Sequence, residues 1–343
     1  YDQVGKIIMK VLITGVAGFL GSHIADKLID NGHEVLGIDN LSGGYIENVN
    51  KDVNLLVEDL KNYELINSFF EGVDIVIHAA CTAYEGLSVF SPYFVTSNTY
   101  EITSSTLSAS INKNIKKFIY LSSMSRYGTQ DSVPFIESMT PKPQDPYGIA
   151  KYASELTVKN LCETHGIKYT ILVPHNIIGP RQKYDDPYRN VASIMTNRIL
   201  NGKPPIIYGD GNQKRCFSFI DDVVDPILLA CDLNTANGMT INVGPDDQFI
   251  TINELAKNIC NLLNYEFEAV YLPERLQEVK YANCSADLAR KILGYEPKTK
   301  FSDGLKQLVG WISKNGPKNF MYNRPIEILN DRVPRFWKND FNE

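Results

Sequence analysis

The hydrophobic positions of the chain fall into two alternating patterns. Short apolar runs such as KVLITG at Lys10–Gly15 and VDIVIHAA at 73–80 have the length of buried strands. Segments between such runs, for example 19–32, 91–112 and 147–165, carry apolar residues at helical spacing. Strands that alternate with helices are typical of right-handed βαβ units, whose parallel sheet is covered on both faces. The pattern therefore predicts an α/β protein built on a doubly wound parallel sheet.

The pattern changes after Pro174, where Gly, Pro and Asp repeatedly interrupt the chain. We expect a first domain at 9–175, to which the apolar stretch at 217–245 returns. The segments 176–216 and 246–343 are expected to form a smaller, mixed α/β substrate domain.

Composition narrows the classes of function. The net charge of −6 and the pI of about 5.5 disfavour a nucleic-acid partner. No apolar run approaches the length of about 18 residues that a membrane helix needs, so no membrane partner is expected. The six cysteines are scattered without a C-x-x-C pair, which indicates reduced thiols in a cytoplasmic protein rather than a metal site. Residues 1–9 lack the order of a secretory signal, and Met9 is a candidate natural start.

The segment TGVAGFLG places Gly15, Gly18 and Gly21 between the first strand and the first helix. Glycine lets the backbone approach a pyrophosphate closely, and the helix N-terminus supplies free N–H groups. A glycine triplet alone is a weak signal. Here a strand precedes it, a helix follows it, and an acid ends the next strand. This context predicts a dinucleotide site in a Rossmann-type domain.

Two acidic residues follow neighbouring strands. Asp39 in GIDN is placed to accept hydrogen bonds from an adenosine ribose, with a turn cap as the alternative. No basic residue in the segment 40–48 would receive a 2′-phosphate, so NAD is favoured over NADP. Asp59 ends the following strand, where binding adenine and capping a turn are equally open interpretations.

Tyr147 and Lys151 lie four residues apart in PYGIAK and so share one helix face. Asp145 is expected to cap this helix, with Pro146 in its first turn. Such a pair is ordinary on a helix surface. After a glycine cradle, it also fits proton transfer, because a lysine ammonium or an oxidised nicotinamide would favour the tyrosinate. Ser123 in LSSMSRYG is then placed to hold the hydroxyl that loses its proton.

These motifs, together with IHAA, PHNIIGPRQ and GDGNQKRCFSFIDD, resemble those of the extended short-chain dehydrogenase/reductases in the same order. The resemblance runs from Lys10 to about Pro297 and leaves the tail RPIEILNDRVPRFW outside it. It implies an enzyme that uses NAD on a nucleotide sugar, with Ser123, Tyr147 and Lys151 as catalytic residues. It also implies NAD contacts at Gly15, Gly18, Phe19, Leu20, Gly21, Asp39, Asn40, Asp59, Leu60, Ala79, Ala80, Asn98, Tyr147, Lys151 and Pro174.

The same resemblance implies a substrate site made of Ser123, Asn176, Arg215, Arg275 and Ala282. Asn176 and the two arginines match family residues that bind the diphosphate, and arginine pairs well with phosphate oxygens. A turn asparagine and solvated arginines are the alternatives. Ala282 matches a gate position at which a small residue admits 2-acetamido sugars.

Met124 and Ser125 narrow the reaction. Dehydratases of this family carry Asp and Glu there, and decarboxylases resemble a pattern with Glu at Ser125, so both reactions are disfavoured. The sequence most resembles the UDP-hexose 4-epimerases, which implies epimerisation of UDP-GlcNAc/UDP-GalNAc or UDP-Glc/UDP-Gal through a 4-keto intermediate. A 4-dehydrogenase or 4-ketosugar reductase would use the same residues, and a non-catalytic NAD-binding scaffold would need only the cradle.

The resemblance further implies a homodimer, in which the segments 91–112 and 150–165 form a four-helix contact. The aromatic residues at 301–311 and 320–337 are expected to serve as core or dimer contacts.

Overall fold

A parallel sheet forms the centre of the protein. The computed structural model describes residues 8–337, so residues 1–7 and the end of the expected substrate domain at 338–343 lie outside the described residues. Within the described part, seven parallel strands pair in the order β11-β6-β5-β4-β1-β2-β3. They are β1 (Lys10–Thr14), β2 (Glu34–Asp39), β3 (Asn54–Val57), β4 (Ile75–His78), β5 (Lys117–Leu121), β6 (Lys168–Pro174) and β11 (Met239–Val243). This order reverses next to β1, which creates a crevice at the carboxyl ends of β1 and β4.

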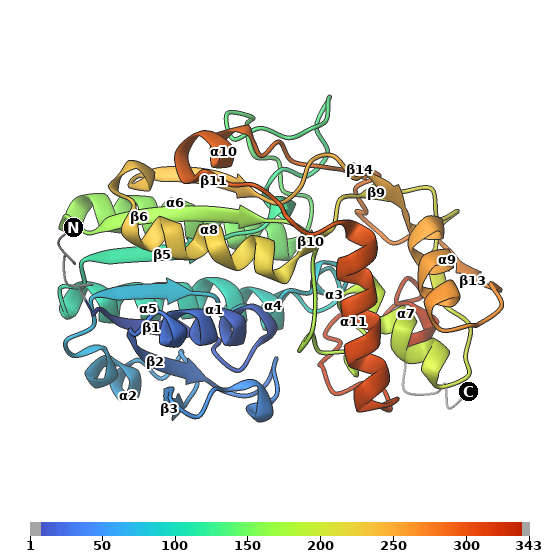
Figure 1. Cartoon of the computed structure of the whole chain (residues 1–343), viewed down its shortest axis with the longest axis horizontal. Coiled ribbons are helices and arrows are strands. Elements are labelled where there is room, and N and C mark those ends of the chain that lie inside the picture. Colours follow the sequence, from blue (N-terminus) through green and yellow to red (C-terminus); the bar gives the residue numbers. More distant parts are fainter. Residues whose placement is uncertain (1–7, 338–343) are drawn as a thin grey trace, which may run out of the picture.

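Helices cover both faces of the sheet, as the alternating sequence pattern predicts (Figure 1). On one face lie α1 (Phe19–Asp30) and α8 (Ile220–Asp232), and on the other lie α5 (Ile102–Asn112) and α6 (Pro146–His165). The short helix α2 (Tyr63–Asn67) packs beside α5. Strands β1, β4 and β5 are almost wholly buried, so their continuous apolar runs are those of a sheet covered on both sides.

Helix α6 begins where its sequence signals predict. Oδ1 of Asp145 accepts the backbone N–H of Gly148 at 2.9 Å, and Pro146 stands in the first turn. The helix ends at Gly166, whose φ of 70° is left-handed and therefore suits glycine. Since the cap fixes the first turn, it also fixes Tyr147 at the cavity end of the helix.

The segment 91–112, expected to be one helix, is broken into three parts. Helix α4 (Pro92–Thr96) passes into a π-helical turn, η3 (Ser97–Glu101), before α5 begins. Asn98 has φ of −82° and ψ of 16° inside this turn, and its side-chain amide donates to the carbonyl of Phe94 at 2.7 Å. A π-turn aims a side chain away from the regular helical row, and here it turns Asn98 toward the crevice.

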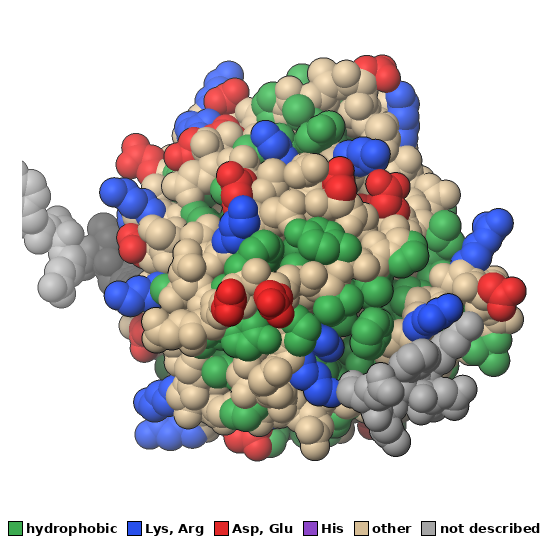
Figure 2. All heavy atoms as spheres, turned by 90° about the vertical axis from the view of Figure 1, so that its right-hand side faces the viewer, with side chains coloured by type: hydrophobic (Ala, Val, Ile, Leu, Met, Phe, Trp, Pro, Cys, Tyr) green, Lys and Arg blue, Asp and Glu red, His purple; other side chains and the backbone are tan. Residues whose placement is uncertain are grey.

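A second, smaller core lies beyond the carboxyl ends of the strands. Helices α7 (Val191–Leu200), α9 (Ile252–Leu262) and α11 (Phe301–Asn315) pack together there. Beside them stand small sheets made of β8 (Ile206–Tyr208), β9 (Lys214–Arg215), β12 (Ile250–Thr251), β13 (Val270–Leu272) and β14 (Tyr281–Ala282). Strand β14 runs parallel to β9 while β12 runs antiparallel to it. On the outward face of this half, hydrophobic side chains gather between separated acidic and basic ones (Figure 2).

Two features refine the expected domain boundaries. Strand β11 and helix α8, both inside 217–245, pack on the main sheet. Helix α10 (Asp287–Leu293) was placed in the substrate domain, but it also packs on β11 and α8. Its buried Ala289 and Leu293 belong to the core of the first domain, so residues 286–295 return there as well. The physical reason is that β11 is an edge strand whose face needs a covering helix.

Some features bear on the excluded classes. No helix within residues 8–337 is long and apolar enough to cross a bilayer. All six cysteines lie in the described part and none is bonded to another. The described residues contain no cluster of three His, Cys, Asp or Glu that could hold a metal.

Candidate active site

A cavity of about 480 Å³ lies between the carboxyl edge of the sheet and the smaller core. Of the residues expected to bind cofactor or substrate, all except Ala282 line it. Ala282 lines an adjoining hollow of about 80 Å³, together with Met124, Asn176, Arg215 and Arg275. Residues that are remote in sequence thus meet at one place. Tyr147 and Lys151 are both buried, so the alternative interpretation of an ordinary pair on a helix surface does not fit.

The glycine cradle is as tight as the motif requires. A Cβ atom at Gly21 would lie 2.2 Å from the carbonyl oxygen of Gly15, and one at Gly15 would lie 2.9 Å from the backbone of Ala80. Gly15 has φ of 75°, which side chains rarely tolerate. The N-terminus of α1 therefore opens directly onto the cavity, where its N–H groups can meet an anion.

Asp39 and Asp59 both face the cavity but differ in setting. Asp39 is buried, and its carboxylate accepts the N–H groups of Ala17 at 2.9 Å and Leu41 at 2.7 Å. Burial raises its pKa, while these backbone donors oppose the rise. Asp39 therefore ties the turn after β2 to the cradle and lines the cavity as well. Asp59 caps its own turn through the N–H of Lys61 at 2.9 Å and accepts from Asn40 at 3.2 Å.

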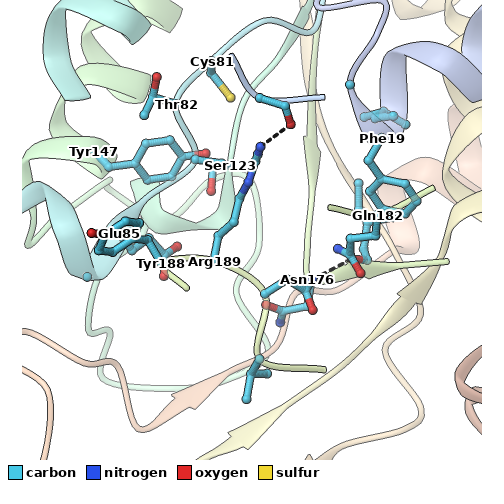
Figure 3. A pocket seen from close by; sticks show the side chains of 18 of the residues that line it. Phe19, Cys81, Thr82, Glu85, Ser123, Tyr147, Asn176, Gln182, Tyr188 and Arg189 are labelled. Carbon is cyan, nitrogen blue, oxygen red and sulfur yellow. Dashed lines mark hydrogen bonds between the residues drawn. The ribbon is translucent and has the colours of Figure 1, made fainter. Parts of the chain in front are cut away.

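The ring of Tyr147 points toward Ser123 beside it at the cavity wall (Figure 3). Tyr147 is 5% exposed and Ser123 is partly exposed, so a hydroxyl entering the cavity can reach both. Ser123 also caps the short 3-10 turn η4 (Met124–Arg126) by accepting the N–H of Ser125 at 3.2 Å. The turn after β5 thereby holds the Ser123 hydroxyl at the cavity wall.

The electrostatics of Tyr147 differ from the sequence-based expectation. Lys151 is 2% exposed, but its ammonium donates to the carbonyl of Leu121 at 2.5 Å and lies 4.7 Å from the centre of the Tyr120 ring. Burial raises the pKa of Tyr147, as do the nearby Cys81 and Glu85, and a hydrogen bond with Ser123 only partly offsets this. The surroundings of Tyr147 therefore favour its protonated phenol, because burial and the neighbouring Cys81 and Glu85 raise its pKa more than the hydrogen bond with Ser123 lowers it. An oxidised nicotinamide bound beside the ring would add a positive charge that favours the tyrosinate.

The residues expected at the diphosphate gather at the other end of the cavity. Asn176 takes a φ of 42°, which asparagine tolerates, and its amide donates to the carbonyl of Cys216 at 2.9 Å. Arg215 lies 3.4 Å from Glu278, so one carboxylate already balances its charge. Arg275 stacks over the ring of Tyr208 at 4.2 Å, and its buried Nε has no hydrogen-bond partner among the described residues. An unsatisfied guanidinium nitrogen is costly unless an anion completes it, so Arg275 fits a phosphate contact.

Sequence reasoning missed a carboxylate at the catalytic centre. Glu85 opens helix α3 (Glu85–Ser88), and its side chain accepts the hydroxyl of Ser125, which in turn lies 3.2 Å from Oγ of Ser123. Figure 3 shows Glu85 facing the same space as Tyr147. Glu85 lies in the segment CTAYEGLSVFSP that follows β4, and an acid within this segment was the available signal. Met124 and Ser125 thus lack carboxylates, but a distant segment supplies one beside them.

The charge of Glu85 affects the pKa of Asp145, the residue that caps α6. Burial raises the pKa of Asp145 to about 6, and the charge of Glu85 adds to the rise. Ser88, in the same helix as Glu85, lies 3.3 Å from Asp145 Oδ1. The cap of α6 is therefore coupled electrostatically to the catalytic cavity.

Further cavity residues come from segments with no recognised motif. Tyr188 and Arg189 precede α7, and Arg189 donates to the carbonyl of Gly43 at 2.6 Å across the cavity (Figure 3). Phe320, Tyr322, Phe336 and Trp337 of the tail also line the cavity. The tail aromatics were expected in core or dimer contacts; Trp337 is buried in an apolar cluster against which Tyr322 and Phe336 pack, and all four residues also line the cavity.

The comparisons with known proteins agree with this geometry. The model of the NAD dependent epimerase/dehydratase family matches residues 11–244, the region that holds the cradle, Ser123, Tyr147 and Lys151. The chain belongs to the NAD-dependent epimerase/dehydratase family. The family resemblance and the Rossmann-type fold expected from the sequence are both confirmed, and the cofactor is NAD.

Similar members of the family act on UDP-sugars. A UDP-glucose 4-epimerase of Thermotoga maritima, solved with UDP-glucose, is 35% identical with a TM-score of 0.85, covering 90% of this chain and 99% of its own. A UDP-N-acetylglucosamine 4-epimerase of Methanobrevibacter ruminantium, solved with UDP-N-acetylmuramic acid, is 33% identical with a TM-score of 0.83 over the same shares. A UDP-N-acetyl-alpha-D-glucosaminuronate decarboxylase of Bacillus cytotoxicus is 29% identical, covering 88% of this chain and 97% of its own length. The family thus contains more than one reaction at this level of similarity.

The cavity fits NAD on its own evidence. A side chain at Gly15 or Gly21 would collide with backbone, so these positions leave the helix N-terminus free for a pyrophosphate. Asp39 and Asn40 stand where an adenosine ribose would lie, and Asn98, Ala79, Ala80 and Pro174 line the way to Tyr147. These residues would hold the cofactor with its reactive end beside Tyr147 and Ser123.

Proposed function

We propose that this protein inverts C4 of a nucleotide sugar through a transient 4-keto intermediate. The observation that carries the proposal is the meeting of Ser123, Tyr147 and Lys151 with the glycine cradle in one cavity. When bound, NAD supplies reversible acceptance of a hydride from the ring carbon. Similar proteins named as 4-epimerases support this choice within the family.

The chain's own residues handle the proton and the orientation. Ser123 holds the C4 hydroxyl beside Tyr147, whose phenolic oxygen takes the proton as the ketone forms. The same oxygen returns that proton when the carbinol is restored. Burial lowers the pKa of Lys151, but its interactions with Cys81, Tyr120 and Glu155 together raise it above the usual value, so Lys151 keeps a positive charge near this exchange. Arg215, Arg275 and Asn176 hold the diphosphate, so the sugar can present either face while the nucleotide stays bound.

The substrate we propose is a UDP-sugar with an uncharged sugar ring. Glu85 places a negative charge beside Ser123 and Ser125, and like charges repel, so a uronate carboxylate would be disfavoured there. Ala282 leaves the adjoining hollow open next to Met124 and Glu85. We therefore propose UDP-GlcNAc/UDP-GalNAc as substrates, with or without UDP-Glc/UDP-Gal. A larger side chain in Ala282→Tyr should lower turnover of the acetamido sugars more than that of UDP-glucose.

One observation favours a second candidate, a 4,6-dehydratase. Water loss from a 4-keto sugar needs a carboxylic acid or base near C5 and C6, which Met124 and Ser125 cannot provide. Glu85 reaches the hydroxyl of Ser125, so it stands close to the place where such a group would act. The two reactions yield different products, a C4 epimer and a 4-keto-6-deoxy sugar.

The deciding experiment incubates the purified protein, without added cofactor, with UDP-glucose, UDP-GlcNAc and UDP-glucuronate. Proton NMR identifies the products, and absorbance of the reduced nicotinamide is followed in parallel. We expect C4 epimers of the neutral sugars and no net reduction of NAD. A 4-keto-6-deoxy product would favour the dehydratase, whereas stoichiometric NADH would identify an oxidoreductase. Tyr147→Phe, which keeps the ring and loses the hydroxyl, is the control for protein-catalysed turnover.

We also propose that the protein is a homodimer in the cytoplasm. Tyr93, Tyr100, Ile149 and Leu156 are exposed apolar side chains on the α4–η3 segment and on α6. Packing these segments against a second copy would bury them, as four-helix contacts do. Light scattering of the wild type and of Leu156→Glu tests this, and a wild-type monomer would overturn it.

A further inference from the structure

The tail after α11 crosses from the smaller core to the first domain. We call residues 317–337 the C-terminal strap. It leaves the smaller core at α7, where Asn197 exchanges two hydrogen bonds of 2.9 Å with the backbone of Lys318. Next, the N–H of Met321 donates to the carbonyl of Asp185 at 2.9 Å. The strap is therefore held at its start by hydrogen bonds from its backbone to the side chain of Asn197 and to the carbonyl of Asp185.

The far part of the strap is fixed to the first domain. The backbone N–H groups of Glu327 and Ile328 both donate to the carbonyl of Phe90, at 3.0 and 2.9 Å. The carboxylate of Glu327 accepts the N–H groups of Tyr93 and Phe94 at 2.9 and 2.8 Å, in the first turn of α4. A carboxylate in this place satisfies donors that a helix start leaves free. The strap thus bridges the two sides of the cavity.

Between these anchors, Arg324 grips the loop that follows Asp39. Its guanidinium donates to the carbonyl of Ser42 and, at 3.1 Å, to the hydroxyl of Tyr84. That hydroxyl in turn donates to Asp186. From the opposite side, Arg189 donates to the next carbonyl of the same loop, that of Gly43. Successive carbonyls of one loop are therefore held by cations from the strap and from the segment before α7.

The loop held by Arg324 rests directly on the glycine cradle. A Cβ atom at Gly44 would lie 2.0 Å from the carbonyl oxygen of Ala17, and the N–H of Tyr45 donates to that oxygen at 3.2 Å. The ammonium of Lys318, also in the strap, lies 4.0 Å from the centre of the Tyr45 ring. Ser42 and Gly43 line the cavity beside Asp39 and Asn40. A movement of the strap would therefore displace the loop that packs against the residues expected to hold the adenosine and the pyrophosphate.

The end of the strap forms part of the wall of the catalytic cavity. Trp337 is 4% exposed and packs in one apolar cluster with Tyr84, Tyr147 and Tyr188. Its ring centre lies 5.2 Å from that of Tyr188. Because the catalytic tyrosine belongs to this cluster, the strap and the reaction centre share a packed core.

We propose that the strap retains the cofactor and that Arg324 is a positioning residue for the loop 41–45. With Arg324 in place, the loop stays closed on the cradle, and NAD leaves only when the strap detaches. This rests on the proposed isomerase function, in which the cofactor is regenerated in each cycle and gains nothing from exchange. The strap lies outside the sequence resemblance to the family, so retention by this route is a property of this chain.

The test measures release of NAD from the full-length protein without any sugar. Protein loaded with NAD is mixed with an NAD-consuming dehydrogenase in excess, and the rate of NADH formation reports release. Arg324→Ala removes the charged donor of Ser42 and Tyr84 and should accelerate NAD release by about tenfold or more. Arg324→Lys keeps the charge with a single donor group, so its rate of NAD release should lie between those of the wild type and Arg324→Ala. Arg332→Ala removes an exposed arginine of the same strap and should release NAD like the wild type.

Thermal unfolding and steady-state kinetics separate positioning from folding. We expect Arg324→Ala to need added NAD for turnover and to recover a wild-type kcat once NAD is saturating. Tyr84→Phe, which removes only the hydroxyl between Arg324 and Asp186, provides a second variant should Arg324→Ala be unstable. Equal release rates in the folded variants would overturn the strap proposal while leaving epimerisation untouched. Faster release in these variants together with no epimer from any sugar would support the strap and overturn the proposed reaction.

Discussion

Replacing Gly21 by alanine tests the most tightly determined contact of the cofactor site. The added Cβ would lie 2.2 Å from the carbonyl oxygen of Gly15 and 2.9 Å from the Cα of Val16, whereas ordinary contacts begin at 3.4 Å. Both neighbours are backbone atoms, so no side chain can swing away. The N-terminus of α1 would have to move away from the cradle by about 1 Å, and overpacking of this kind costs about 1–3 kcal/mol.

A shift of this size should lower the affinity for NAD more than it lowers the stability of the fold. The N–H groups of α1 would no longer meet a pyrophosphate at hydrogen-bond distance, and each bond to a charged group contributes about 1.5–3 kcal/mol. We therefore expect Gly21→Ala to weaken NAD binding by at least about tenfold, with a smaller fall in thermal stability.

Titration calorimetry of cofactor-free protein with NAD, combined with thermal unfolding, measures both effects. Gly310→Ala is the matched control, because its Cβ would meet nothing within 4 Å on α11. It should leave NAD affinity unchanged and stabilise the protein by about 0.5–1 kcal/mol through helix propensity. Wild-type affinity for NAD in Gly21→Ala would refute the assignment of this turn as the pyrophosphate cradle.

Three further predictions concern the catalytic cavity. Tyr147→Phe should lower kcat by about 10²–10⁴-fold, as expected for loss of the group that moves the proton, while the affinity for NAD stays within about a few-fold of the wild type. A product assay by NMR measures kcat, and an unchanged kcat would show that Tyr147 does not take part in the chemistry. Glu85→Gln should raise the affinity for UDP-glucuronate relative to UDP-glucose by about fivefold, which corresponds to about 1 kcal/mol for a charge at a solvated cavity wall. Competition binding measures this ratio of affinities. An unchanged ratio would mean that the charge of Glu85 does not exclude the uronate. Asp145 has a folded-state pKa raised to about 6 from 3.8, so the folded state binds its proton more tightly than the unfolded state does. Its contribution to stability is therefore fully present below pH 3.8 and is lost as the pH rises through 6, by an amount on the order of 3 kcal/mol. Asp145→Asn keeps a capping side chain, and its urea unfolding should lack this loss; parallel pH profiles for the two proteins would show that the pKa is not raised.

Local chemistry made much of the fold predictable. The runs at β1 and β4 read as strands because both faces of a parallel sheet are covered, so nearly every position is apolar. The start of α6 was predictable from Asp145 and Pro146, since capping depends on residues close in sequence. The π-turn at Asn98 was not, because a break in helical geometry that costs little locally is decided by what it faces. The packing of helix α10 on β11 was not predictable for a similar reason, since covering β11 is a matter of tertiary packing.

The candidate site divides in the same way. Gly15, Gly18, Gly21, Tyr147 and Lys151 could be named from the sequence, because their spacing alone sets the geometry of a turn and of one helix face. The position of Glu85 against Ser125 depends on two loops that follow different strands, and no spacing relates them. The direction of the Tyr147 pKa also came only from the structure, because desolvation depends on what is packed around the ring.

By itself, then, the sequence determined the parallel sheet, the glycine-rich turn and the placement of Tyr147 and Lys151 on one helix face, all of which follow from periodicity and short-range spacing. Only the tertiary structure decided which carboxylate reaches Ser125, where the tail runs, and how Arg324 meets the loop after Asp39. The reason is physical: these contacts join segments from 40 to 282 residues apart, and their energies depend on burial and distance rather than on neighbours along the chain.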